Sequence, residues 1–152
     1  MTPEATVCDQ FLGDHRGLEA LLDRVIAALV ANDTDDAARI WAECCAGLVL
    51  HLETEEHHLI PALLRRSEQD ARVLALEHRH IRSRLTELSA AIASQQAKPG
   101  AIRDFSDELG AHSRNEERLL YRWAETHLDD QERLTAVEAL ATGLGRTEAQ
   151  PA

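Results

Sequence analysis

Hydrophobic residues recur at alternating steps of three and four along most of the chain, a period typical of helices that bury one face in a bundle. Between about Thr6 and Ala31 these positions are Cys8, Phe11, His15, Leu18, Leu22, Val25 and Leu29. A histidine therefore occupies a position that the pattern assigns to the core. Because an unpartnered imidazole costs free energy on burial, His15 needs a partner.

A second helix is predicted from about Asp35 to Arg66, after the helix-capping residues Asn32-Asp33-Thr34. Its buried positions are Ile40, Cys44, Gly47, His51, Glu55, His58 and Ala62. Polar side chains thus fill the second half of this face. Pro61 lies inside the pattern, so we expect the helix to kink or to end early there.

Two further long helices are predicted, from the capping sequence Ser67-Glu68-Gln69-Asp70 to about Gln95, and from about Ala101 to His127 after a loop over Gln96–Gly100. The buried positions of the third helix are Leu74, His78, Ile81, Leu85, Leu88 and Ile92. Those of the fourth are Ile102, Phe105, Leu109, His112, Glu116, Leu119 or Leu120, and Trp123. Each of the two faces again contains a histidine.

Asp129-Asp130-Gln131-Glu132 can cap a short fifth helix that ends near Gly143 and packs over one end of the bundle. The sequence therefore predicts an all-α fold, an up-and-down antiparallel four-helix bundle with a short C-terminal fifth helix. We assign residues 1–145 to this one domain and expect residues 146–152 to form a disordered tail.

Composition agrees with a helical domain and limits its partners. A chain of 152 residues is long enough for one sizeable core, and its 3% of aromatic residues gives little support to a sheet. The formal charge of -11 disfavours nucleic acid and anionic membranes. We therefore expect neither as a partner, and the sequence identifies no protein partner.

The cysteines and the N-terminus indicate a reducing compartment. Cys8, Cys44 and Cys45 form no CxxC pair, so neither a disulfide framework nor a thiolate zinc site is expected. The first ten residues lack the basic and apolar regions of a signal peptide, and charged residues interrupt every apolar run. We expect a cytoplasmic protein.

Two copies of an HxxxE motif contain the main candidate chemistry. His51 precedes Glu55, and His112 precedes Glu116, by four residues. On a helix this spacing places an imidazole and a carboxylate on one face, about one turn apart, as metal ligands often are. One such pair is a weak signal, but two pairs that each lie within an apolar stripe are much stronger.

The predicted topology brings four polar stretches to one level. His15 and His78 each lie roughly ten residues, or about 15 Å, from the start of their helices. Glu55 and Glu116 each lie roughly eleven residues before the end of theirs. In an antiparallel bundle these depths coincide. The candidate metal ligands are His15, His51, Glu55, His78, His112 and Glu116.

Four imidazoles and two carboxylates suit a pair of borderline metal ions, with each Glu able to bridge them. Iron is favoured over zinc, because a structural zinc site prefers four ligands and often includes sulfur. Iron is also favoured over manganese, although manganese is compatible with these donor atoms. The alternative is a hydrogen-bonded polar layer in a metal-free bundle.

At these residues the sequence resembles the hemerythrin-like, or HHE cation-binding, domain. The match covers about residues 8–127 and consists of Asp14-His15-Arg16, His51xxxGlu55-Glu56 leading into Leu59-Ile60-Pro61, Glu77-His78, and His112xxxGlu116-Glu117. The resemblance implies an oxo- or hydroxo-bridged di-iron centre in an up-and-down bundle. It also implies ligand roles for His15, His51, Glu55, His78, His112 and Glu116.

Two departures from oxygen-carrying hemerythrins matter. Where they have a second histidine four residues after the one matched by His78, this chain has Arg82, which cannot coordinate a metal. Where they have an aspartate five residues after the last histidine, this chain has Glu116 after four. The sequence resembles a six-ligand branch, in which an iron has an open or water-filled position or His58 supplies a seventh ligand. Arg82 is expected beside the site or in a surface ion pair.

The remaining polar and aromatic residues are predicted to lie outside the metal site. His57, His80 and His127 fall off the buried faces, Glu56, Glu77 and Glu117 are expected on solvated faces, and Tyr121 and Trp123 are expected in the core. Glu55xxHis58 and Glu77xxHis80 also fit the ExxH motif of ferritin-like proteins. That fold is disfavoured, because the fourth helix has the reverse order and the first offers a histidine.

These features predict a cytoplasmic non-haem di-iron protein that binds or reacts with dioxygen, nitric oxide or hydrogen peroxide. If it is an enzyme, peroxide disproportionation is the favoured reaction, with the metals as the catalytic groups and no protein nucleophile. The alternative is a non-catalytic iron or oxygen sensor, or an iron-binding regulatory module, in which metal binding is coupled to folding.

Overall fold

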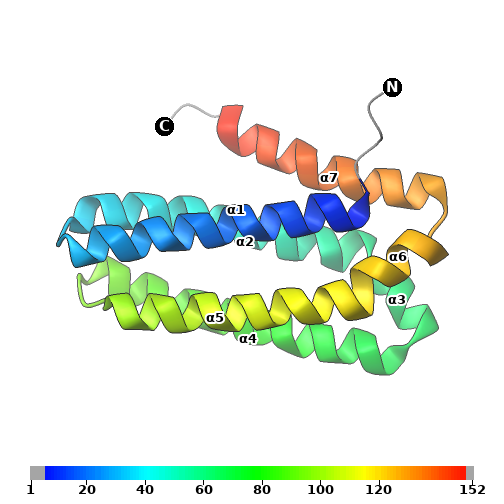
Figure 1. The fold of residues 1–152 in the computed structure, drawn as a ribbon, viewed down its shortest axis with the longest axis horizontal. Helices are drawn as coiled ribbons and strands as arrows, with labels where there is room; N and C mark the ends of the chain where they lie inside the picture. Colours follow the sequence, from blue (N-terminus) through cyan, green and yellow to red (C-terminus); the bar gives the residue numbers. More distant parts are fainter. Residues whose placement is uncertain (1–5, 150–152) are drawn as a thin grey trace.

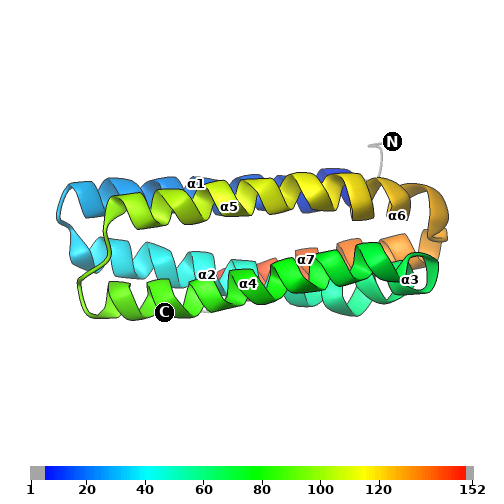
Figure 2. The same ribbon diagram turned by 90° about the horizontal axis from the view of Figure 1, so that it is seen from below.

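The computed structural model describes residues 6–149 of the chain, with side chains for residues 6–143. Four long helical segments form a bundle in which neighbouring segments run antiparallel (Figures 1 and 2). They are α1 (Val7–Val30), α2 (Thr34–His58), α4 (Glu68–Ala93), and α5 (Pro99–Glu116) with its continuations η1 (Glu117–Tyr121) and α6 (Arg122–His127). The short α3 (Ile60–Arg66) follows α2, and α7 (Asp130–Ala149) closes the described chain. The predicted all-α bundle is confirmed.

Each long helix packs against two neighbours. Helix α1 contacts α2 and α5, and α4 contacts the same two helices. Figure 2 shows α1 beside α5 on one side of the bundle and α2 beside α4 on the other. The four helices therefore surround one central space, and residues on the four inner faces can meet there.

Polar side chains cap the starts of α1 and α4. Thr6 Oγ1 accepts a hydrogen bond from the Asp9 backbone at 3.0 Å, and Ser67 Oγ accepts one from the Asp70 backbone at 3.3 Å. Pro99 occupies the first turn of α5, where a missing N–H costs nothing. The predicted starts of the four long helices are therefore right to within two residues.

The break expected near Pro61 is present. Helix α2 ends at His58, Leu59 has φ -117 and ψ -50, and α3 starts at Ile60 with the proline in its first turn. Proline lacks the N–H that would continue the α2 hydrogen-bond ladder, and its ring would clash with the preceding turn. The chain bends here and reaches α4 at the same end of the bundle as α6 (Figure 1).

A π-helical turn interrupts the fourth segment, which the sequence predicts as one regular helix. This turn, η1, starts directly after Glu116. Because a π turn contains more residues than an α turn, it shifts every later side chain around the helix axis. Leu120, Tyr121 and Ala124 are buried as a result, whereas Trp123 is only partly buried, so its predicted place on the buried face is wrong.

The core consists of two apolar clusters with a polar layer between them. Along each long segment, the polar residues separate members of one cluster from members of the other; on α1, His15 lies between Phe11 and Leu18. The cluster toward the α1–α2 turn includes Leu18, Leu48, Ile81 and Leu109, and the other includes Phe11, Leu59, Leu74 and Leu120. The clusters shield the polar layer from solvent at both ends.

Helix α7 packs along α2 and α1 (Figure 1), with Ala136 and Leu140 buried. It passes Gly143 and ends at Ala149, so it is longer than expected. A Cβ at Gly143 would lie 2.5 Å from Leu50 Cδ2, which shows how closely α7 approaches α2. Of the predicted tail, residues 146–149 belong to α7 and residues 150–152 lie outside the described residues.

None of the helices in the described part of the chain combines the length and hydrophobicity that a membrane span requires.

Candidate metal site

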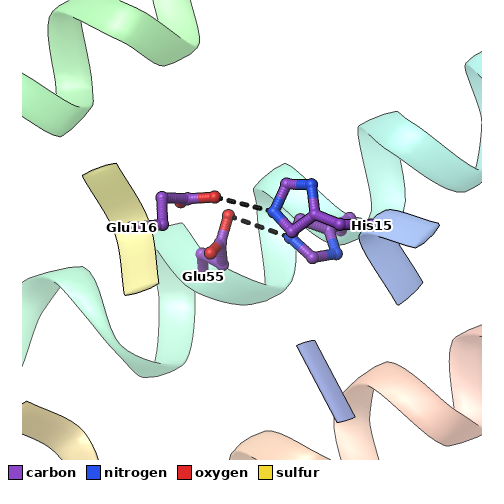
Figure 3. Close-up of side chains that lie close together, drawn as sticks. His15, Glu55 and Glu116 are labelled. Carbon is purple, nitrogen blue, oxygen red and sulfur yellow. Dashed lines mark hydrogen bonds and ion pairs between the residues drawn. The ribbon is translucent and has the colours of Figure 1, made fainter. Parts of the chain in front are cut away.

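Six polar side chains from four helices converge between the two apolar clusters. Helix α1 provides His15, α2 provides His51 and Glu55, α4 provides His78, and α5 provides His112 and Glu116. None is more than 3% exposed. Figure 3 shows His15 facing Glu116, with Glu55 beside them. The structure thus brings together all six residues that the sequence singles out.

The six side chains form two groups that could each hold a metal ion. His15 and His51 form the first group with Glu55 and Glu116, and His78 and His112 form the second with the same two glutamates. Within each group, one ligand atom from every residue lies within 4.8 Å of the others. Since both glutamates belong to both groups, each can bridge two ions.

All four imidazoles turn the Nε2 atom toward the carboxylates. Glu116 Oε1 lies 3.0 Å from His15 Nε2 and 2.9 Å from His112 Nε2. Glu116 Oε2 lies 3.2 Å from His78 Nε2. Glu55 Oε1 lies 3.4 Å from His51 Nε2 and 3.5 Å from His78 Nε2. A common inward direction of the same ring atom is what a shared metal centre requires.

Outer carboxylates hold three of the imidazoles in this orientation. The Nδ1–H of His51 donates to Asp14 at 2.6 Å, and that of His112 donates to Glu77 at 2.6 Å. The Nδ1 of His78 lies 3.4 Å from Glu56. Because an ionised carboxylate only accepts hydrogen bonds, the proton stays on Nδ1 and the Nε2 lone pair of the neutral ring is free for a metal.

This outer layer differs from the sequence expectation. The sequence predicts solvated positions for Glu56 and Glu77, but both contact a histidine of the site, and their side chains are only 30% and 27% exposed. Arg82 pairs with Glu56, and Asn115 donates to Glu77 at 2.7 Å. Arg82 therefore supports the site indirectly. Glu117 pairs with the exposed Arg122, as expected for a solvated face.

A sequence signal for these outer carboxylates exists. Asp14 and Glu77 directly precede His15 and His78, two histidines of the buried faces. A residue one position away on a helix points about 100° to the side, toward the neighbouring helix. Asp14 accordingly contacts His51 of α2, and Glu77 contacts a histidine of α5.

Tyr121, which the sequence pattern places in the core, is also a residue of the site. Its ring is fully buried, but its hydroxyl donates to Glu55 Oε2 at 2.7 Å and lies 3.1 Å from Glu116 Oε1. It also lies 3.0 Å from His15 Nε2 and 3.2 Å from His51 Nε2. Five residues separate Tyr121 from Glu116, which is not an α-helical spacing, so only the π turn explains why they share a face.

The other histidines lie elsewhere. His58, one of the two alternatives for the seventh position, belongs to neither group and lines a pocket with Leu50, Thr54 and Gly143, between α2 and α7. The three remaining histidines, His57, His80 and His127, are exposed, as the sequence predicts.

The carboxylates govern the electrostatics of the metal-free site. Burial by itself lowers the pKa of an imidazole, but Glu55, Glu116 and the outer carboxylates outweigh it. The pKa rises to about 10 for His51, to about 10 for His78 and to about 9 for His112. Burial raises the pKa of Glu116, yet its bonds to the imidazoles hold that pKa well below the usual range. In the absence of metal, protons balance the buried negative charge.

Two buried atoms show that protons alone do not satisfy the site. Glu55 Oε1 and His112 Nε2 have no hydrogen-bond partner, although His112 Nε2 lies 2.9 Å from a carboxylate oxygen. A short nitrogen–oxygen distance without hydrogen-bond geometry is expected when both atoms are metal ligands directed at the same ion. Imidazole nitrogen and carboxylate oxygen are the donors that suit iron and similar ions, so the residues present fit a pair of them.

Removal of an outer carboxylate should weaken metal binding while the six inner residues remain. For Glu77→Ala we expect a loss of affinity of about 10- to 100-fold, since His112 loses the acceptor that orients its ring. Competition with a chelator measures the change. Glu108→Ala is the matched control, because Glu108 pairs with the exposed His80 on the same side of the bundle. Equal affinity of the two variants would contradict the role assigned to Glu77.

A comparison with known proteins agrees with this geometry. A family model described as the hemerythrin HHE cation binding domain matches residues 6–124, which include all six converging residues. No curated protein and no solved structure gives a significant match.

Proposed function

The chain belongs to the hemerythrin HHE cation-binding domain family, and from this premise we propose that it holds two iron ions and binds or reacts with a small oxidant. The residues that would hold the ions are His15, His51, Glu55, His78, His112 and Glu116. The oxidants that fit are dioxygen, nitric oxide and hydrogen peroxide.

The observation that carries this proposal is the sharing of both glutamates between two groups of four. A single ion would need one such group, and a structural zinc site would be closed by four ligands, often with sulfur among them. Here the free cysteines lie elsewhere: Cys8, Cys44 and Cys45 belong to neither group. Two ions that accept nitrogen and oxygen donors fit this arrangement, and iron is the one that adds redox chemistry.

Burial of the site limits the size of its ligand. Since the six side chains are at most 3% exposed, no large substrate reaches the metals without a rearrangement of the bundle. Bound iron would supply a redox-active Lewis acid with an exchangeable position. The apolar clusters exclude bulk water from it, and the outer carboxylates keep the Nδ1 protons in place. A diatomic molecule or a peroxide is small enough to enter such a site.

Metal analysis together with absorption spectroscopy tests the proposal. We expect about two irons per chain after aerobic reconstitution, as in other two-metal bundle sites, and a spectrum that changes when nitric oxide or peroxide is added. One zinc per chain, or no iron at all, would refute the di-iron proposal. The matched comparison is His51→Ala against His57→Ala, because His57 is exposed and belongs to neither group.

Catalysis and sensing give different results in the same experiments. An enzyme of this type should disproportionate hydrogen peroxide, and turnover should vanish in His51→Ala while the fold persists. A sensor or regulatory iron-binding module should show little turnover but a large change of stability on metal binding. The cytoplasmic location remains a prediction.

A further inference from the structure

The hydroxyl of Tyr121 lies inside one of the two metal groups. It contacts all four members of the first group, His15 Nε2, His51 Nε2, Glu55 Oε2 and Glu116 Oε1, at 3.0, 3.2, 2.7 and 3.1 Å. Within the described residues no hydrogen bond joins it to His78 or His112 of the second group. The two candidate metal positions are therefore unequal, although their histidines and glutamates match.

Hydrogen bonding alone does not account for these four contacts. A phenol has one proton to donate and accepts at most two hydrogen bonds. Donation to Glu55 uses the proton, and the two imidazoles can fill the acceptor positions. The oxygen of Glu116, 3.1 Å away, could also accept from the phenol, but one proton cannot be donated fully to both glutamates. The hydroxyl has one neighbour too many for a purely hydrogen-bonded role.

The same distances are those of donor atoms around one ion. Nitrogen and oxygen donors lie about 2.1 Å from a first-row metal, and in octahedral geometry adjacent donors are then about 3.0 Å apart. The phenol oxygen has four such neighbours, between 2.7 and 3.2 Å away. An ion held by His15, His51, Glu55 and Glu116 would therefore have the phenol oxygen at the spacing of a fifth ligand atom.

Two features of the fold hold the phenol there. The π turn of η1 brings Tyr121 onto the face of Glu116, which an α-helical turn would not do. Phe11 packs beside the tyrosine ring, with a centroid separation of 5.4 Å, and contacts His51 at the same separation. π turns occur frequently at functional sites, because the extra residue redirects a side chain.

The second group has the more open side. A surface groove between α4 and α5 is lined by Ile81, Ala111, His112 and Asn115, and so reaches a histidine of that group. The first group faces the buried rings of Phe11 and Tyr121 instead. The groove therefore lies nearest to the second position, separated from it by the ring of His112.

We propose that Tyr121 is a ligand of the metal held by His15 and His51, and that the metal held by His78 and His112 is the one that accepts the small ligand. This inference rests on the proposed di-iron function. When the phenol oxygen binds a ferric ion, its O–H bond breaks and the proton passes to solvent, together with those displaced from the imidazoles. No change of oxidation state accompanies the step, since aerobic reconstitution already supplies the ferric ion.

Tyrosinate spectroscopy tests this ligand directly, because the chain contains one tyrosine. A phenolate bound to ferric iron gives a visible charge-transfer band, and Raman excitation within that band enhances the ring modes of the phenolate. We expect both signals in the iron-loaded wild-type chain. Any such signal must come from Tyr121, so the wild-type measurement decides even if a variant fails to fold.

Tyr121→Phe completes the test, since it removes the oxygen and keeps the ring. We expect the variant to lose the visible band and the enhanced modes while it retains iron. We also expect azide to bind to one iron per chain in the wild type and to two in the variant, because a second position opens. Iron-loaded wild type without tyrosinate modes would overturn the inference and leave the di-iron proposal intact. Absence of iron would refute the proposed function itself.

Discussion

Glu116→Gln is expected to abolish binding of both metals, from about two irons per chain to almost none. Glu116 belongs to both groups and lies within 3.2 Å of three imidazoles. The substitution keeps the size of the side chain but removes the charge that balances two cations. An amide also has only one oxygen, so it cannot bridge two ions as a carboxylate does. Elemental analysis after reconstitution measures the result.

The neighbouring glutamate provides the matched control. Glu117 lies on the same helical segment, but its side chain is 37% exposed and pairs with Arg122. Glu117→Gln should retain the wild-type iron content. His15→Ala provides a graded comparison, since His15 belongs to one group only, and should lose one ion rather than two. If Glu116→Gln and Glu117→Gln bind iron equally, the shared-carboxylate arrangement is wrong.

The convergence of the six polar residues could be predicted because helical periodicity fixes both direction and depth. The three-four repeat places His15 and His78 on buried faces, and a rise of about 1.5 Å per residue places them at the level of Glu55 and Glu116 in antiparallel neighbours. These relations need no knowledge of side-chain contacts. The effect of Pro61 could be predicted for the same reason, since the constraint it imposes is local to the backbone.

Tyr121 could not be assigned, because its position depends on a local departure from the α-helix. A regular helix would turn residue 121 away from Glu116 and would bury Trp123 in its place. No residue type in Glu117–Tyr121 specifies a π turn in the way that proline specifies a kink. Three of the four contacts of the phenol hydroxyl come from α1 and α2, so they exist only after the bundle has assembled.

The metal-free chain is expected to lose stability as the pH rises, and bound metal is expected to cancel that loss. Without metal, the pKa values of His51 and His78 are about 10, above the value of about 6.5 in an unfolded chain. The folded state therefore binds more protons between these values, and its stability falls as the pH rises. One such histidine gives a slope of about 1.4 kcal/mol per pH unit, or about 3 °C in Tm. Below about pH 4.5 stability falls again, because the depressed pKa of Glu116 means that the unfolded state takes up protons first.

Metal binding should cancel the alkaline limb of this profile, because the ion displaces the protons that the imidazoles carry. Above about pH 6.5 the buried histidines of the metal-loaded chain and those of the unfolded chain then bind equal numbers of protons. The gain in Tm on addition of anaerobic iron(II) should grow from pH 6.5 to pH 9, as fewer protons compete for Nε2. Thermal unfolding at several pH values, with and without iron(II), measures the gain. Glu116→Gln should flatten both profiles, since it removes the charge that raises the pKa of His78 and His112. His127→Gln, at an exposed site, should leave both unchanged. A gain in Tm that is constant over this range would mean that the ion does not compete with protons for the buried imidazoles, and so does not bind there.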